Sequence, residues 1–444
     1  MVIHFMNFAN HLSNNLHDVT TTHAIRTVYA YCSYLAIVPL NINTLSLSWK
    51  ATLLCFIMYL TDGYFATNYM RGQFQFQQNK MLAFLVPKAF RTVETFLQMV
   101  MYTTILHTHL FYNSQLKFIL RRITHVDARM SLVHGMRSSD LDVNLPRKIH
   151  SFFIFFSIFS FLAMAFRHLT ISPYSATAIF GFFLPHFQPY AITAQFITFL
   201  DIITNRFDAI NSYIKSLKLL HYEKTLNMTI VKGELTTLAC VHNDLCNLCL
   251  LVNKYFNVQI LLTVACHFLS ISVAAYTFLS SLGMFFQNET MSNTQMILLV
   301  LHTVLWICQR FVILILTAQA SIRAQTSARD THQISHKLLI KEHVPGLCQE
   351  LELFTSNVEK HQVEFSACGF FPIDYSMIYM IIGAATTYWV ILVQIQSSAF
   401  TPQSPQANSN ATTPKPTLSS LVNTIVNVTT MLNAIPTNKT GVMG

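Results

Sequence analysis

Charged side chains are scarce in this chain. Only 11% of its 444 residues are charged, whereas 52% are hydrophobic and 36 are Phe. A soluble globular protein carries about 25% charged residues. The chain therefore has too little polar surface to coat a soluble protein of its length, and its composition indicates an integral membrane protein.

Several common signatures are also missing. Residues 1–25 are polar and contain no basic start followed by an apolar run, so no cleavable signal peptide is visible. The net charge is +9, but no stripe of Lys and Arg with interleaved aromatics points to nucleic acid. There is no His-Glu-x-x-His motif, Walker loop, Gly-x-Ser-x-Gly motif or dinucleotide fingerprint. Nothing in the sequence argues for an enzyme or a cofactor.

Long apolar runs, in contrast, are plentiful. A spanning helix needs about 20 mostly apolar residues. Seven segments qualify, at roughly 47–69, 90–112, 149–170, 178–203, 256–286, 295–318 and 375–397. We therefore expect an all-α integral membrane protein built as one seven-transmembrane helix bundle. The shorter stretch at 31–40 ends near Pro39 and predicts a re-entrant or interfacial helix leading into the first span.

Lys and Arg predict the orientation of the bundle. They gather in the loops 113–148, 204–254 and 319–374, which follow the second, fourth and sixth spans. Basic loops stay in the cytoplasm, so we expect an intracellular N-terminus and an extracellular C-terminus. A rhodopsin-like receptor has the opposite orientation. Apolar residues recur at helical spacing in these loops, which predicts helical cytoplasmic extensions of the spans.

This topology divides the chain into successive parts. We expect a cytoplasmic N-terminus with the re-entrant helix, six spans with cytoplasmic helical loops, a cytoplasmic helical anchor, a seventh span and an extracellular, disordered tail, at 1–46, 47–318, 319–374, 375–397 and 398–444. Glycosylation sequons fall on the predicted outer side at Asn288, Asn410, Asn427 and Asn438. Asn227 also matches but lies on the inner side, where we expect it to stay unmodified.

None of the nine cysteines lies in a predicted exterior loop, so no disulfide framework is expected. The run CVHNDLCNLC at 240–249 places three thiols and His242 close together, and a zinc site there is conceivable. However, Cys246 and Cys249 also have ordinary helical spacing. We favour buried cysteines on a helix face and expect no metal.

Polar residues inside apolar spans usually face a cavity or a partner helix. The fourth span contains Pro185 and Pro189, and we expect these prolines to break its outer half. The fifth span contains His267 and Ser270. The candidate ligand-binding residues of the fourth and sixth spans are His186, Gln188, Tyr190, Gln195, His302, Trp306 and Arg310. They would line an outward-opening pocket, or they would hydrogen-bond between helices and hold the bundle together. The sequence leaves both readings open.

The seventh span carries a stripe of small and polar residues. On a helix, Gly383, Thr387, Ile391, Gln394 and Ser398 share one face, since they step by four, four, three and four. Such a stripe requires water or a symmetry mate. If several copies surround an axis, Ile391 and Ile395 would form an apolar constriction beside a ring of Gln394 amides.

The stretch FSACGFFPIDYSMIYMIIGAATTYWVILVQIQ at 365–396 resembles the carboxy-terminal signature of the insect gustatory receptors. That family is part of the seven-transmembrane insect chemoreceptors and is related to the insect odorant receptors. Its signature is a Cys-Gly-Phe-Phe segment before a final helix with Thr-Tyr, five mostly apolar residues and Gln. Thr387, Tyr388 and Gln394 match this spacing, and Ile395 stands where the family usually has Phe.

The resemblance implies a tastant-gated, non-selective cation channel in the plasma membrane of sensory neurons. It implies a homotetramer, or a heteromer with related receptors, whose pore is lined by the last helix. Thr387, Ile391, Gln394 and Ile395 would then form the pore and gate. The implied partners are a small-molecule tastant, permeating cations and membrane lipid. Two alternatives stay open: a G-protein-coupled receptor, and a temperature-gated or co-receptor subunit of the same channel family.

Overall fold

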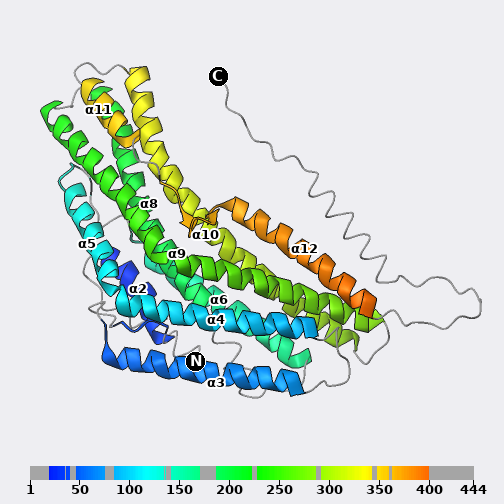
Figure 1. Cartoon of the computed structure of the whole chain (residues 1–444). Helices are drawn as coiled ribbons and strands as arrows, with labels where there is room; N and C mark the ends of the chain where they lie inside the picture. The colour runs from blue at the N-terminus through cyan, green and yellow to red at the C-terminus, as the bar shows by residue number, and fades with distance from the viewer. Residues whose placement is uncertain are drawn as a thin grey trace, which may run out of the picture.

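In the computed structural model, the described residues are 20–35, 37–40, 47–75, 85–134, 136, 142–170, 187–222, 228–286, 292–342, 348–359 and 363–399. Long helices dominate this part of the chain and lie alongside one another (Figure 1). The elements are α2 (Thr20–Tyr34), α3 (Trp49–Gln75), α4 (Leu85–Phe111), α5 (Asn113–Met130), α6 (Leu145–Thr170), α8 (Phe187–Tyr222), α9 (Met228–Phe286), α10 (Asn293–Glu342), α11 (Cys348–Glu359), β1 (Ser366–Ala367), β2 (Phe371–Pro372) and α12 (Tyr375–Ala399).

Each of the seven predicted spans overlaps one helix: α3, α4, α6, α8, α9, α10 or α12. Residues 178–186 of the predicted fourth span lie outside the described residues. Within the described residues, three helices are long and apolar enough to cross a membrane by length and composition, at Leu145–Phe166, Thr229–Phe278 and Asn293–Ile340. A shorter apolar helix occupies Tyr375–Ile391. Polar residues such as Asp62 and Glu94 lie within α3 and α4.

Three helices continue far beyond the predicted spans. α8, α9 and α10 have 36, 59 and 50 residues, whereas about 20 are enough to cross a bilayer. Their extensions lie together with α5 and α11 at one end of the molecule (Figure 1). The predicted helical extensions are therefore confirmed, and they form a second packed region of the same chain.

The first described helix differs from the short apolar helix predicted at 31–40. α2 covers Thr20–Tyr34, and Leu40 then bridges to Leu47. The residue before a proline is disfavoured from helical backbone, so Pro39 is consistent with a helix that ends before it. Tyr31 is buried, accepts or donates a 2.6 Å hydrogen bond with Nδ1 of His150, and stacks on Phe153. α2 thus packs against α6 and α8.

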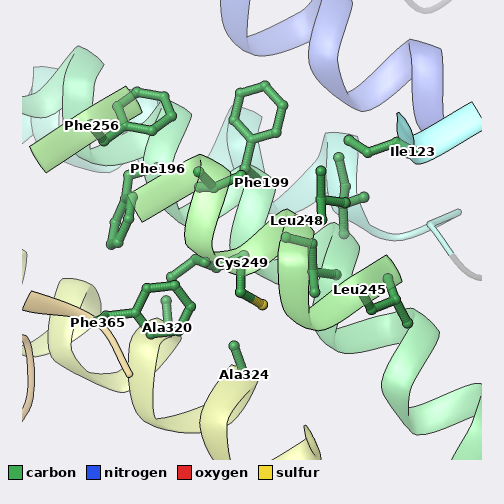
Figure 2. Packing of buried hydrophobic residues seen from close by; sticks show 14 of the residues in the cluster. Ile123, Phe196, Phe199, Leu245, Leu248, Cys249, Phe256, Ala320, Ala324 and Phe365 are labelled. Atoms are coloured by element: carbon green, nitrogen blue, oxygen red, sulfur yellow. The ribbon is translucent and has the colours of Figure 1, made fainter. Parts of the chain in front are cut away.

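The centre of the hydrophobic core lies where α8, α9 and α10 meet (Figure 2). The labelled side chains there are Ile123, Phe196, Phe199, Leu245, Leu248, Cys249, Phe256, Ala320, Ala324 and Phe365. Ala320 and Ala324 are small and buried, so α10 can approach the aromatic side chains of its neighbours closely. This core joins the bundle to the extended region.

The cysteines of 240–249 lie on α9. Cys246 and Cys249 are buried as predicted, but Cys240 is exposed, so the prediction was wrong for that residue. Sγ of Cys246 lies 3.7 Å from Nδ1 of His242. Among the described residues, no group of three His, Cys, Asp or Glu is placed to hold a metal ion.

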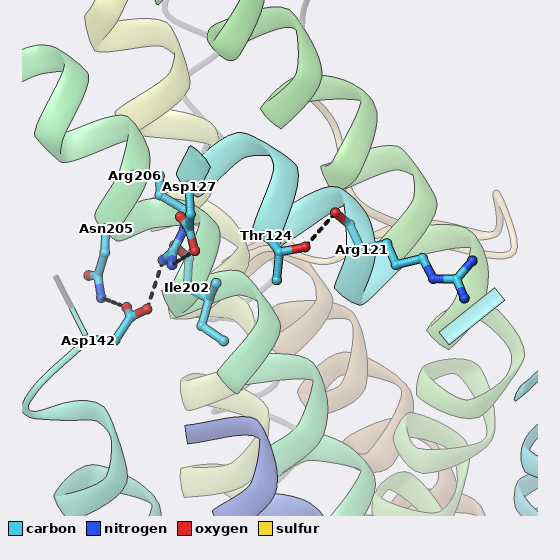
Figure 3. A network of polar contacts seen from close by, with 7 residues as sticks. All are labelled: Arg121, Thr124, Asp127, Asp142, Ile202, Asn205 and Arg206. Atoms are coloured by element: carbon cyan, nitrogen blue, oxygen red, sulfur yellow. Dashed lines mark hydrogen bonds and ion pairs between the residues drawn. The ribbon is translucent and has the colours of Figure 1, made fainter. Parts of the chain in front are cut away.

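A buried ion-pair network links α5, α8 and the start of α6 (Figure 3). Arg206 has a fully buried side chain, and its Nε and Nη2 donate to the two carboxylate oxygens of Asp127 at 2.8 and 3.0 Å. Its Nη1 donates to Asp142 at 2.9 Å and to the Ile202 carbonyl at 2.7 Å. Burial alone would lower the pKa of Arg206, but the two carboxylates outweigh it and raise that pKa.

Candidate functional site

One candidate site is a buried cluster of aromatic rings around Arg310. Tyr190 lies in the first turns of α8, and Trp306 and Arg310 lie one turn apart on α10. The helix α8 begins at Phe187, so Pro189 occupies its first turn, where proline is tolerated. Pro189 therefore helps to begin α8 and does not break it, so the prediction of a break was wrong for Pro189. Pro185 lies outside the described residues.

The Arg310 guanidinium lies between two aromatic faces. Its Cζ is 4.4 Å from the centre of the Trp306 ring and 5.3 Å from that of Tyr190. His302 lies 5.9 Å from Trp306, and His267 of α9 is nearly parallel to Tyr190 at 6.5 Å. Cation–π contacts of this kind stabilise a desolvated cation. Side chains from three helices therefore converge on one buried positive charge.

Hydrogen bonding in this cluster is incomplete. Trp306 donates from Nε1 to Oγ of Ser270 at 3.2 Å. Within the described part of the chain, Nε and Nη2 of Arg310 have no acceptor, although Arg310 is only 1% exposed. The hydroxyl of Tyr190 is likewise buried, and its interactions with Ser160 and Arg310 do not reach full hydrogen-bond geometry. Unsatisfied buried donors are costly and uncommon, so the cluster is suited to a group that brings hydrogen-bond acceptors.

Not all the predicted pocket residues join the cluster. Gln195 points to α2, where its Nε2 lies 3.2 Å from Sγ of Cys32. His302 also contacts α6, with its Nδ1 2.7 Å from the Ala163 carbonyl. Gln188 lines a separate cavity of about 20 Å³ beside Asp62, large enough for roughly one water. His186 lies outside the described residues.

A second candidate site is the face of α12 that the single chain leaves uncovered. Its opposite face packs on α9 and α10 through Met377, Ile381 and Ala385, which are buried. Thr387 and Gln394 are exposed, and Ile391 is 45% exposed. The side chain of Ile395 lies outside the described residues. The described members of the predicted stripe, from Gly383 to Gln394, thus lie on the face turned away from the rest of the chain. The side chain of Ser398 also lies outside the described residues.

The hairpin before α12 fixes where that helix begins. β1 and β2 pair antiparallel, and Cys368 and Gly369 between them have φ of 52° and 72°. A tight hairpin turn requires such left-handed backbone, which glycine adopts at little cost. The Cys368 N–H donates to Oδ1 of Asn257 on α9, and Oδ1 of Asp374 accepts from the Ser376 N–H at 2.8 Å. The hairpin therefore ties the start of α12 to α9.

Together, these features define a polytopic helical membrane protein with a buried polar cluster and an apolar helix, α12, that has one uncovered face. The family model for the 7tm Chemosensory receptor matches residues 25–398. The chain therefore belongs to the 7tm chemosensory receptor family and is a receptor, not an enzyme.

Curated relatives agree with this family. The chain is 25% identical to the provisionally named gustatory receptor 28a of Drosophila melanogaster over 55% of its own length and 60% of that protein. It is 26% identical to the provisionally named receptor 28b over 50% of its length and 51% of that protein. Over 41% of its length it is 28% identical to the gustatory receptor for bitter taste 66a, covering 34% of that receptor. The matches thus span only part of each relative.

The fold has a solved counterpart. The olfactory receptor OR5 from Machilis hrabei, in complex with eugenol, matches with a TM-score of 0.50 over 84% of this chain and 97% of that chain. Sequence identity is 13%, so the likeness concerns the fold. It establishes the seven-transmembrane insect receptor architecture for this chain.

Sequence reasoning missed the residues that complete these sites. It did not single out Arg206, Asp127 and Asp142, although an arginine between the apolar residues Ile203 and Phe207 was a signal for a buried ion pair. It also missed Asn257, whose amide oxygen holds the hairpin. That contact joins residues 111 positions apart and leaves no local pattern.

Proposed function

We propose that the chain is a tastant-gated, non-selective cation channel that assembles as a tetramer around its α12 helices. The observation that carries this proposal is the uncovered face of α12 with Thr387, Ile391 and Gln394. Family membership supports it, because the relatives are gustatory receptors. In this proposal, the channel functions in the plasma membrane of sensory neurons.

The pore follows from the cost of polar groups in lipid. Exposed amide and hydroxyl groups on a membrane helix are unfavourable against hydrocarbon and favourable against water. Copies of α12 around an axis would give Gln394 and Thr387 a water-filled lumen. Ile391, with Ile395 one turn on, would narrow that lumen with apolar side chains, and such a constriction closes by dewetting.

The ligand site we propose is the Arg310 cluster. Tyr190 and Trp306 offer flat apolar faces, while Arg310 offers donors without acceptors. A small molecule with a ring and an oxygen acceptor fits both needs. If it binds better when the α12 helices are spread, it shifts the population towards the open pore.

The orientation in this proposal is the one given by the charge rule, with the N-terminus and the helical extensions inside. Outside glycosylation at Asn288, Asn410, Asn427 and Asn438 belongs to the same proposal. These four asparagines lie outside the described residues. The division of the chain at 1–46, 47–318, 319–374, 375–397 and 398–444 likewise stays a proposal.

The test expresses the chain alone and applies a panel of sugars and bitter compounds while current is recorded. We expect an evoked cation current, and we expect Gln394→Ala to change the permeability ratio measured from reversal potentials while surface expression is kept. Thr386→Ala is the control, because Thr386 lies on a different face of α12 from Gln394. Unchanged permeation in Gln394→Ala would contradict the pore role.

Two alternatives have distinct outcomes in the same preparation. Evoked current from the purified protein in a bilayer excludes a need for a G protein. Current evoked by warming without any ligand would instead favour the temperature-gated subunit. A response that requires a co-expressed relative would show that this chain works as part of a heteromer.

A further inference from the structure

A cavity of about 670 Å³ lies between α6, α8 and α10, apart from the Arg310 cluster. Its walls come from residues 144–156 of α6 and the turn before it, 194–201 of α8 and 316–323 of α10. These three helices pack on one another in the bundle (Figure 1). The cavity is much larger than the one beside Gln188 and has room for a substantial part of an organic ligand.

Charged residues collect at one end of the cavity. Arg147 and Lys148 begin α6, and Arg323 lies on α10. Nη1 of Arg323 is 3.2 Å from Oδ1 of Asp201, and Nζ of Lys148 is 4.0 Å from the other oxygen of that carboxylate. Asp201 is the single acid among the residues that line the cavity. Three cations against one carboxylate leave this end with an excess of positive charge.

The other end of the cavity is apolar. Going from the charged end into the bundle, the lining of each helix changes to hydrophobic side chains: Phe152, Phe155 and Phe156 on α6, Ala194 and Ile197 on α8, and Leu316 on α10. Lys148 and Phe156 are eight residues apart on α6, which corresponds to about 12 Å along a helix. The α6 wall of the cavity therefore has a polar end and an apolar end, as the headgroup and acyl chain of an amphiphile would require.

The charged end also coincides with a predicted membrane boundary. Arg147 and Lys148 belong to the basic loop 113–148, Asp201 lies near the end of the predicted fourth span, and Arg323 follows the sixth. In the orientation of the proposed function, this boundary is the cytoplasmic one. Basic pockets between membrane helices on that side suit anionic lipid headgroups.

We propose that this cavity binds an anionic phospholipid of the cytoplasmic leaflet. Its phosphate would lie against Arg147, Lys148 and Arg323, and an acyl chain would run along the Phe152–Phe156 wall. The ring of Phe156 is 5.0 Å from that of Tyr190 in the Arg310 cluster, so the bound chain would end beside the candidate ligand site. The inference uses the orientation of the proposed function but not the channel activity.

Lipid retention on the purified full-length protein tests this inference. The protein is equilibrated with equal amounts of phosphatidylserine and phosphatidylcholine, and the bound lipid is measured by native mass spectrometry. We expect phosphatidylserine to be retained preferentially. Arg147→Gln should reduce that preference by about fivefold, the effect of one basic residue near an anionic lipid. Arg147 is exposed and its removal leaves the Asp201 ion pairs in place.

The matched control is Arg121→Gln. Arg121 is an exposed arginine on α5, outside the cavity lining, so its loss should leave the lipid preference unchanged. A second variant, Ile197→Trp, fills the apolar end and should lower retention of phosphatidylserine further, with folding checked by gel filtration. Equal reductions in Arg147→Gln and Arg121→Gln would overturn the proposal.

A competition experiment with the soluble headgroup tests whether the acyl chains are needed for binding. Glycerophosphoserine lacks acyl chains, so it should not displace the retained phosphatidylserine at comparable concentration. Displacement by glycerophosphoserine would show a site for the soluble phosphodiester headgroup and overturn the lipid assignment. Because the readout is bound lipid, a failure here is distinguishable from a failure to conduct ions.

Discussion

Arg206 and Arg310 are two buried arginines of the same chain with opposite surroundings. Arg206 is 0% exposed, and each of its three side-chain nitrogens donates to a carboxylate. Arg310 is 1% exposed, lies between aromatic rings, and has two nitrogens without an acceptor in the described part of the chain. The charge of Arg206 is balanced by two carboxylates, whereas the charge of Arg310 is only partly compensated by aromatic rings.

The difference separates a structural role from a receptive one. A buried charge that is fully paired holds helices in register, and removing one partner leaves the others uncompensated. A buried charge with unsatisfied donors stays available to a molecule that brings acceptors. The extended end of the bundle thus carries a fully paired network, whereas the cluster between α8 and α10, which we propose as the ligand site, keeps donors without acceptors.

The largest effect we expect is from Arg206→Met. This change removes the cation that compensates the buried Asp142 and the partly buried Asp127, which costs about 3–5 kcal/mol. The purified variant should show a strongly lowered thermal midpoint and a reduced monodisperse fraction in gel filtration. Arg121→Met, at an exposed position on α5, should leave both measurements close to those of the parent. A stable Arg206→Met protein would mean that the network does not hold this region together.

A smaller effect on stability is expected from Arg310→Met. Methionine fills similar space without a charge, and replacing an incompletely compensated buried charge by an apolar side chain is close to neutral or stabilising. The thermal midpoint should stay near that of the parent, while the evoked response should fall by about tenfold or more, equivalent to about 1.4 kcal/mol of lost ligand binding.

Two other results for Arg310→Met would contradict the proposed difference between Arg206 and Arg310. If Arg310→Met unfolds as readily as Arg206→Met, then both arginines are structural. If it is stable and responds normally, the cluster is not the ligand site. Arg310→Lys sharpens the reading, because it keeps the charge but loses the planar group that stacks on Trp306.

Much of the fold was readable from local pattern. Apolar run lengths located seven helices, and helical spacing predicted that α8, α9 and α10 would extend past the membrane. The spacing of His302, Trp306 and Arg310 also placed their rings and charge on one face of α10. These features depend on residues close in sequence, so a single sequence contains them.

Features that depend on contacts between residues far apart in the sequence could not be predicted from the sequence alone. Gln195 lies on the same helix as Tyr190, yet it contacts Cys32 of α2 and not the Arg310 cluster. Cys32 lies far earlier in the chain, so no local pattern around Gln195 indicates this contact. Pro189 was predicted to break a helix, but α8 begins at Phe187, so Pro189 lies in its first turn, where proline is tolerated. The two ends of the cavity between α6, α8 and α10 come from three separate segments, which composition alone could not align.

The most direct test of the pore compares two neighbouring threonines of α12. Thr387 shares the uncovered face with Gln394, whereas Thr386 lies about 100° around the helix. Both hydroxyls donate to backbone carbonyls one turn earlier, so the two cysteine replacements are matched. A membrane-impermeant cationic thiol reagent is applied while evoked current is recorded, with the parent protein as the baseline for its native cysteines. We predict that the reagent blocks current through Thr387→Cys and spares Thr386→Cys; block of Thr386→Cys alone, or equal effects at both positions, would contradict a pore lined by this face of α12.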